Sequence, residues 1–252
     1  QNGVPIGYVL NSTLFRSGEI AYNVFESFRG GEAAFVYSRV CAMMRTLFLV
    51  DTLTIYPYQL GDGNSEGLKS GAWWFYQKLG YRPKDRGALA TMKRELAAMK
   101  RRPAHRSSLA TLRGLAAHNL YLHLGEERDD VIGLLPNAFV GLAITELLAR
   151  RFGSQREEGE TILAAEAAAL CGVDSFDGWT DGESLAWRRW APLIAVLDGV
   201  ADWTAEERLA LADVVRSKGG RREQDFVLAF DSHPRLRAAV LALGRRMRAE
   251  RD

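Results

Sequence analysis

The sequence predicts an α+β fold in which a partial mixed sheet with flanking helices is followed by an all-α region, so that the chain is mostly helical overall. Three segments rich in β-branched and aromatic residues, which favour strands, precede Gly61. After about Arg86, apolar residues recur at the three- and four-residue spacing of amphipathic helices. The apolar fraction of 47% over 252 residues suits one large domain or two modest ones.

The first part of the chain reads as strand, strand, helix, strand and helix. Antiparallel strands are expected at 4–15 and 19–28, and a helix at 32–49. The apolar positions that predict the buried face of this helix are Phe35, Val36, Val40, Met43, Met44 and Leu47. A third strand is expected at 50–60, where Pro57 marks an edge, a bulge or the strand's end because it cannot donate a hydrogen bond.

A second helix is expected at 66–79, with Gly80 as a left-handed cap. Everything after about Arg86 is helical in pattern, without a convincing strand. The expected helices of that region are residues 88–101, 107–124, 137–152, 157–171, 183–198, 204–217 and 235–249. Thr204 and Glu207 have capping-box spacing, which supports the helix start there. We therefore expect two domains, residues 1–86 with the sheet and residues 87–252 with helices alone.

The charge balance gives no large field for attracting nucleic acid or an anionic membrane, because 33 Lys and Arg face 31 Asp and Glu. One basic run stands out: Lys93, Arg94, Lys100, Arg101, Arg102, His105 and Arg106. Acids elsewhere and dispersal around a helix favour a solvated face for it, so nucleic acid is an unlikely partner at this stage. No window has the roughly 18 uncharged apolar residues that a membrane span needs, and no leader opens the chain. A cytoplasmic protein that does not bind a membrane is expected.

The two cysteines, Cys41 and Cys171, lie among apolar residues at helical spacing, which is typical of buried free thiols. The four histidines have no metal-ligand spacing, so no metal is expected. The chain begins with Gln1 rather than Met, and we expect that residues upstream are missing from it.

Residues 72–81 read AWWFYQKLGY, which resembles the A-x-x-F-Y-x-K-L-G-F signature of the GNAT superfamily of N-acetyltransferases. The resemblance implies a GNAT-like mixed sheet that binds acetyl-CoA or another acyl-CoA. In the family this tyrosine often protonates the departing CoA thiolate, so the resemblance implies that Tyr76 is the general acid. A thiol has a pKa near 8 to 9, and a phenol at hydrogen-bond distance can donate its proton as the C–S bond breaks.

The segment Phe28-Arg29-Gly30-Gly31-Glu32-Ala33-Ala34 lies where the family has its Q/R-x-x-G-x-G/A pyrophosphate loop. Amides at a helix N-terminus can hold a diphosphate, and glycines let it approach closely. The resemblance implies that the cofactor-binding residues are Arg29, Gly30, Gly31, Ala33 and Ala34. Aligned on Arg29, the loop ends correctly at Ala34 but has Glu32 in place of a glycine. Aligned one residue earlier, Gly31 and Ala33 fit and the leading Q/R is lost.

Family enzymes commonly need a base on the strand before this loop, and Glu19 and Glu26 are the candidates. They are an odd number of positions apart, so on one regular strand they would face opposite sides of the sheet. We favour Glu19. The resemblance covers about residues 4–83, lacks the family's opening strand and first two helices, and has Lys69 where the family has asparagine, although Asn64 lies nearby.

Two functions remain open at this stage. The first is an N-acyltransferase that moves an acetyl or acyl group from acyl-CoA to an amine of a small molecule or a protein by direct attack. The second is a non-catalytic GNAT-like module joined to a helical protein-interaction domain. Glu32 and Lys69 favour the second.

Overall fold

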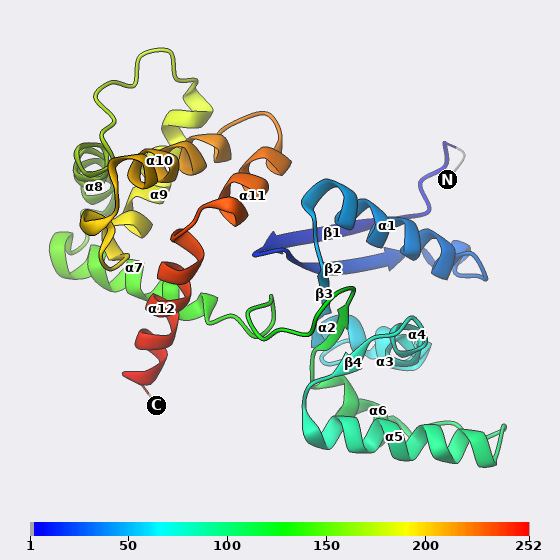
Figure 1. Cartoon of the computed structure of the whole chain (residues 1–252). Helices are drawn as coiled ribbons and strands as arrows, with labels where there is room; N and C mark the ends of the chain where they lie inside the picture. Colours follow the sequence, from blue (N-terminus) through cyan, green and yellow to red (C-terminus); the bar gives the residue numbers. More distant parts are fainter. Residues whose placement is uncertain (1–2, 252) are drawn as a thin grey trace. The chain divides into compact units, whose positions relative to one another are not determined.

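The structure, a computed structural model, describes residues 3–251, and Gln1 lies outside them. The chain divides into two compact units, residues 1–133 and 134–252. The fold class is α+β and mostly helical, as the sequence predicts (Figure 1). The division comes later than the expected boundary at residue 86, because residues 87–133 pack in the first unit and complete its sheet.

The sheet of the first unit has five strands in the order β1-β2-β3-β5-β4. Strands β1 (Gly7–Leu14) and β2 (Ser17–Val24) form an antiparallel hairpin, and β2 pairs in parallel with β3 (Thr52–Ile55). Strand β5 (Leu120–His123) pairs antiparallel with both β3 and β4 (Arg82–Pro83). The hairpin turn is formed by Phe15 and Arg16, both at positive φ, as a two-residue turn between twisted strands requires.

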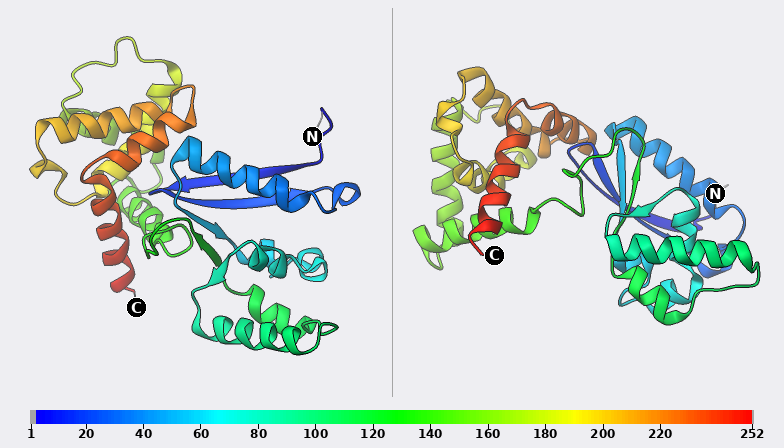
Figure 2. Two further views of the ribbon diagram at one scale, coloured as in Figure 1. Left: turned by 45° about the vertical axis from the view of Figure 1, so that its right-hand side comes forward. Right: turned by 60° about the horizontal axis from the view of Figure 1, so that its bottom comes forward.

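The parallel pair separates along its length. Its register runs only from Ser17 opposite Thr52 to Glu19 opposite Thr54, whereas β2 continues to Val24 along β1. Beyond Glu19, β3 therefore diverges from the hairpin, which Figure 2 shows in its left view. A gap between the carboxyl ends of parallel strands is a common place for a ligand in mixed and parallel sheets.

Helix α1 (Ala33–Phe48) follows the short 3-10 helix η1 (Glu26–Phe28) and covers one face of the hairpin (Figure 1). Its buried residues are Tyr37 and Met44. Phe35, Met43 and Leu47, expected on the buried face, are exposed. Met44 is buried and Val40 packs against the core, as predicted, so the buried face is rotated from the predicted one rather than opposite to it. Tyr37 lies at its centre, and its hydroxyl is 2.6 Å from that of Tyr81.

Two of the predicted elements are divided in the structure. The strand expected at 50–60 ends at Ile55, and Pro57 begins the short helix α2 (Pro57–Leu60), where its missing N–H costs nothing. The helix expected at 66–79 is α3 (Ser65–Ser70) followed by α4 (Ala72–Lys78), with a break at Gly71. Gly80 follows α4 at φ 106°, the left-handed conformation predicted for it.

The helix predicted at 88–101 is α5 (Arg86–Arg101). The helix predicted at 107–124 is divided into α6 (Leu109–Ala116) and strand β5. The helical pattern of this region had predicted no strand. Residues 124–133 are also tied to the sheet: the hydroxyl of Thr54 donates to the Ile132 carbonyl at 2.8 Å, and the Ile132 amide donates to Ser17 at 2.8 Å. These bonds explain why the first unit extends to Gly133.

The second unit is helical throughout, apart from its connecting segments. Its helices are α7 (Asn137–Phe152), α8 (Arg156–Cys171), α9 (Asp181–Val196), α10 (Ala205–Lys218), α11 (Glu223–Ser232) and α12 (Leu236–Ala249), with η2 (Val200–Asp202) before α10. All but α11 and η2 were predicted, and the capping box of Thr204 and Glu207 is confirmed. No helix between residues 3 and 251 is long and apolar enough to cross a membrane.

Candidate active site

A cavity of about 500 Å³ lies where β2 and β3 separate, at their carboxyl ends. Its walls come from the β1–β2 hairpin, the start of α1, the α2–α3 segment and α4. Of the residues predicted for the site, Arg29, Ala33 and Tyr76 line it. Gly30, Gly31, Ala34 and Glu19 are not among its lining residues. The volume falls in the range of small-molecule sites.

Tyr76 lies on α4 and is only 3% exposed. Its ring packs edge-on against Tyr37 and Tyr81, at centroid distances of 5.6 and 5.8 Å. Its hydroxyl hydrogen-bonds to no residue that the structure describes. Burial raises the pKa of Tyr76, and the nearby Tyr22 and Cys41 raise it further, so the phenol stays protonated at neutral pH. A cavity-lining phenol that keeps its proton is available as a donor to a ligand.

Tyr37 supports Tyr76 from α1. Its hydroxyl lies 2.6 Å from that of Tyr81, and both groups are buried. Its ring also meets Tyr22, another cavity residue, edge-on at 5.3 Å. Sequence reasoning missed Tyr22 and Tyr37, since nothing in their spacing indicates that two different elements bring them beside α4. They fix the position of the Tyr76 ring through packing.

The loop before α1 brings one cation to the cavity. Nε of Arg29 donates to the Val24 carbonyl at 2.9 Å, and its guanidinium lies 2.5 Å from the Glu66 carboxylate. The first bond holds Arg29 at the end of β2, and the second links it to α3. Glu66, which also lines the cavity, was not predicted as a site residue.

The fold itself does not require glycine at positions 30 and 31. A Cβ atom placed on Gly30 or Gly31 would meet nothing within 4 Å, and neither residue has a positive φ. Both are exposed beside the N-terminus of α1. Glu32 is the N-cap residue of α1, and its side chain makes no capping bond. Neither backbone conformation nor steric crowding requires glycine at these two positions. The absence of side chains there leaves room for a ligand to approach the loop.

Glu19 lies in β2 on the same face as Ala21 and Asn23, which line the cavity. Burial raises its pKa. Tyr56 lies near it, and its own pKa is raised by burial and then by the Glu19 charge. Glu26 is exposed in η1, outside the strand, so the comparison of strand faces does not apply to it. Glu19 is two residues along β2 from the cavity-lining Ala21.

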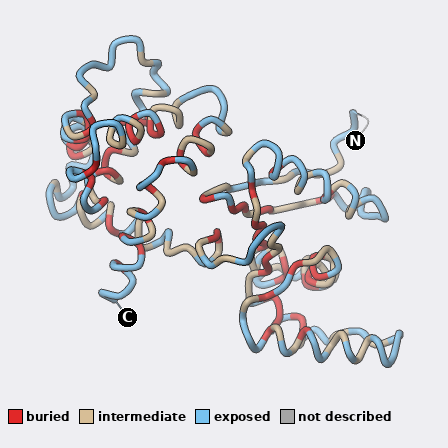
Figure 3. The backbone as a smooth tube through the Cα atoms, viewed as in Figure 1, coloured by how far each residue is buried: buried red, intermediate tan, exposed pale blue. Residues whose placement is uncertain are grey.

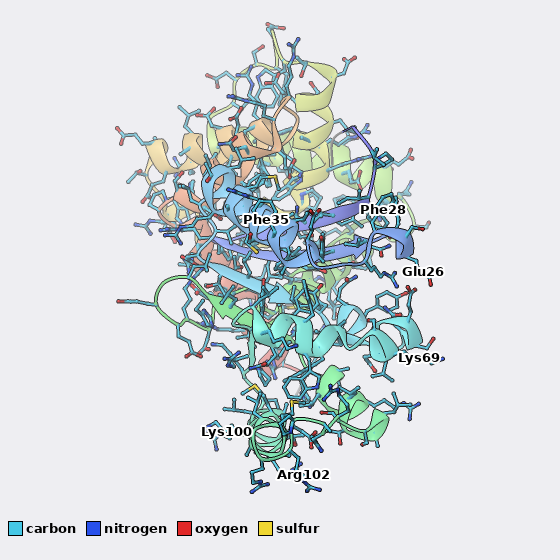
Figure 4. The ribbon with its side chains drawn as sticks, turned by 90° about the vertical axis from the view of Figure 1, so that its right-hand side faces the viewer. Glu26, Phe28, Phe35, Lys69, Lys100 and Arg102 are labelled. Carbon is cyan, nitrogen blue, oxygen red and sulfur yellow. The ribbon has the colours of Figure 1, made fainter. Side chains whose placement is uncertain are left out.

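Asn64 and Lys69 lie in the α2–α3 segment, which differs from the family signature, and only Asn64 lines the cavity. The Asn64 side chain accepts from the Gly67 amide at 3.1 Å as the N-cap of α3, and it lines the cavity. Lys69 is exposed at the end of α3 and is labelled in Figure 4. Asn64 therefore has a structural role in positioning this wall.

Comparisons of the chain with protein-family models, with curated proteins and with solved structures found no match.

Proposed function

We propose that the first unit is an acyl-CoA-dependent N-acyltransferase. The observation that supports this most is that one cavity is lined by Arg29 and Ala33 from the loop before α1 and by Tyr76 from α4. These are the two segments that resemble the family's pyrophosphate loop and its closing signature. A diphosphate near the start of α1 would meet a cation and the positive end of a helix dipole.

In the proposed reaction, the acceptor amine attacks the thioester carbonyl carbon while its nitrogen loses a proton to Glu19, directly or through water. The tetrahedral intermediate then expels the CoA sulfur, and Tyr76 hydrogen-bonds to that sulfur and gives it its proton. The raised pKa of Glu19 makes its carboxylate a better base than an exposed one. When the product leaves, Glu19 releases the amine proton to solvent and the tyrosinate takes up a proton from solvent, so that both groups return to their starting states.

The alternative is a non-catalytic module, in which the aromatic residues around Tyr76 serve only the core. The buried Trp73, the extensive packing of Tyr37 and the carboxylate of Glu32 beside the loop favour it. The open environment of Gly30 and Gly31 favours the enzyme. Binding of CoA separates the two functions.

The test is a thermal-shift titration of the full chain with acetyl-CoA and with CoA. A ligand that binds the folded state raises the melting temperature by mass action. Gly31→Val places a branched side chain where the phosphates would lie without a clash in the fold. Gly125→Val is the matched control, because Gly125 is also exposed, in a loop, with nothing within 4 Å of an added Cβ.

If the first unit is an acyltransferase, the melting temperature should rise saturably with acetyl-CoA or CoA. Gly31→Val should abolish this rise, and Gly125→Val should leave it unchanged. No rise with either ligand would overturn the proposal in favour of the scaffold. A rise that both variants keep would place the ligand elsewhere than at this loop.

A further inference from the structure

The α5–α6 hairpin carries a concentration of positive charge that the composition of the whole chain conceals. Residues 86–118 contain eight Lys and Arg and one acid, Glu95, a net charge of +7 in a chain whose total is +2. All eight cations are exposed, and none is in an ion pair with a residue that the structure describes. They are Arg86, Lys93, Arg94, Lys100, Arg101, Arg102, Arg106 and Arg113.

The sequence pattern predicted that these charges would be dispersed around the helix. In the structure those on α5 lie on one side of it. Arg86, Lys93 and Lys100 are spaced by seven residues, nearly two turns, so they follow one line along the helix. Arg94 and Arg101 lie next to that line. The opposite side of α5, with Ala88 and Met92, is buried. Figure 3 shows the outward side of α5 as exposed, and in Figure 4 Lys100 and Arg102 project away from the rest of the first unit.

The single acid of the hairpin does not neutralise this face. The Glu95 carboxylate accepts from Ser107 at 2.6 Å and lies 3.0 Å from Nε2 of His105, and it is 13% exposed. Ser107 in turn accepts from Nε1 of Trp74 at 3.2 Å. Glu95 therefore holds the loop between α5 and α6 against α4 and forms no ion pair with the eight cations among the described residues.

The chemistry of the face fits a phosphate backbone. Six of the eight cations are arginines, whose planar guanidinium binds phosphate through two parallel hydrogen bonds. The hairpin has no Phe, Tyr or Trp, so it lacks the large aromatic rings on which unpaired bases stack most strongly. Most of its apolar side chains, such as Met92 and Leu115, are buried against the first unit, so the hairpin presents little apolar surface to a lipid.

We propose that the α5–α6 hairpin binds double-helical nucleic acid through its phosphates, without reading the base sequence. The line from Arg86 to Lys100 is about 21 Å long at 1.5 Å per residue, which matches about six base steps of a duplex. The five cations on this side of α5 then give a slope of log affinity against log salt near −4.5.

The test uses the full chain and fluorescence anisotropy with a 20-base-pair RNA duplex and a DNA duplex of the same sequence, over a range of salt concentrations. Lys93→Gln with Lys100→Gln should weaken binding at least tenfold and make the slope shallower by about 2. Arg188→Gln with Arg189→Gln is the matched control, because it removes two exposed charges from α9 and should change neither quantity.

Binding of either duplex with that slope supports the inference, and a preference between the two shows which nucleic acid is bound. Equal binding to polyglutamate or to vesicles rich in phosphatidylserine would overturn it, as would the absence of binding at low salt. A single-stranded oligonucleotide that binds more tightly than both duplexes would also contradict it. The inference is independent of the acyltransferase proposal, because CoA binding does not enter the measurement.

Discussion

The guanidinium of Arg29 lies 2.5 Å from the Glu66 carboxylate, so that an ion pair joins the loop before α1 to the first turn of α3 on the wall of the cavity. Both side chains are substantially exposed, at 39% and 66%. An exposed pair of this kind contributes only about 0 to 1 kcal/mol. A ligand phosphate could therefore replace Glu66 as the partner of Arg29 at little cost.

Glu66→Gln should tighten CoA binding, because it removes the carboxylate that competes with the diphosphate for Arg29. We expect the apparent Kd for CoA to fall about two- to fivefold, in keeping with the modest energy of an exposed pair. Isothermal titration calorimetry at low salt measures it. Glu26→Gln removes the same charge from η1 without touching the pair and serves as the control. An equal gain in both variants would mean that net charge, rather than competition for Arg29, governs binding.

Tyr76→Phe should lower turnover with acetyl-CoA at least about tenfold while CoA affinity stays within about twofold, because the hydroxyl is needed only when the sulfur leaves. The melting temperature should not fall, since this hydroxyl makes no hydrogen bond within residues 3–251. Steady-state kinetics with a thiol-trapping reagent provide kcat and KM. Tyr58→Phe, which lines the same cavity from α2 but is exposed, is the control. A loss of CoA affinity as large as the loss of turnover would show that Tyr76 is not the group that protonates the sulfur.

The sequence predicts the helices of the second unit well, because their signals are local. Capping residues such as Thr204 and apolar periodicity act within one or two turns. Strand β5 was missed for the opposite reason. Its four residues, Leu120–His123, form an apolar run as compatible with a helix as with a strand, and only pairing with β3 and β4 decides between them. Because β5 belongs to the sheet of the first unit, that unit extends to Gly133 rather than to residue 86.

The residues of the candidate site could be predicted where they belong to a continuous sequence motif. They could not be predicted where their role depends on a contact with a residue far away along the chain. Arg29 and Tyr76 belong to continuous motifs, and both line the cavity. Glu66 and Tyr37 belong to none, and their roles arise from partners more than 30 residues away along the chain, at 2.5 and 2.6 Å. Tyr37 also explains why the buried face of α1 is rotated from the predicted one, because its buried hydroxyl has the Tyr81 hydroxyl as its partner.

The hydroxyl pair of Tyr37 and Tyr81 should show strong coupling in a double-mutant cycle. Either single change to Phe leaves the other buried hydroxyl without its partner, which costs about 1 to 3 kcal/mol. The double variant should cost clearly less than the sum of the two. Hydrogen exchange of α1 peptides gives the local opening free energy for each variant. Additive costs would show that the 2.6 Å contact contributes no stability.

In the second unit, Gly219→Ala should be strongly destabilising. A Cβ atom at position 219 would lie 2.2 Å from the Gly182 carbonyl oxygen, so the N-terminus of α9 and the end of α10 would have to separate. We expect a loss of at least about 2 kcal/mol, read from hydrogen exchange in these two helices. Gly141→Ala, in α7 with nothing near its added Cβ, should instead stabilise by about 0.5 to 1 kcal/mol. Similar effects of both changes would show that the close contact of the two backbones is not maintained.

Glu19→Gln should raise stability at neutral pH while it lowers activity. Burial raises the folded-state pKa of Glu19 above its ordinary value of 4.5, so the folded protein carries an unfavourable charge once pH exceeds that pKa. The variant should therefore melt at a higher temperature than the parent at pH 7, and the difference should vanish as pH falls below 4.5. Glu26→Gln controls for the loss of one charge.

If Glu19 is the base, the same change also flattens the rising limb of kcat/KM against pH, which reports the ionisation of the free enzyme's base. A variant that gains stability without losing activity would assign the proton-accepting role to another group. A variant that loses stability at pH 7 would show that the Glu19 charge is satisfied in the fold.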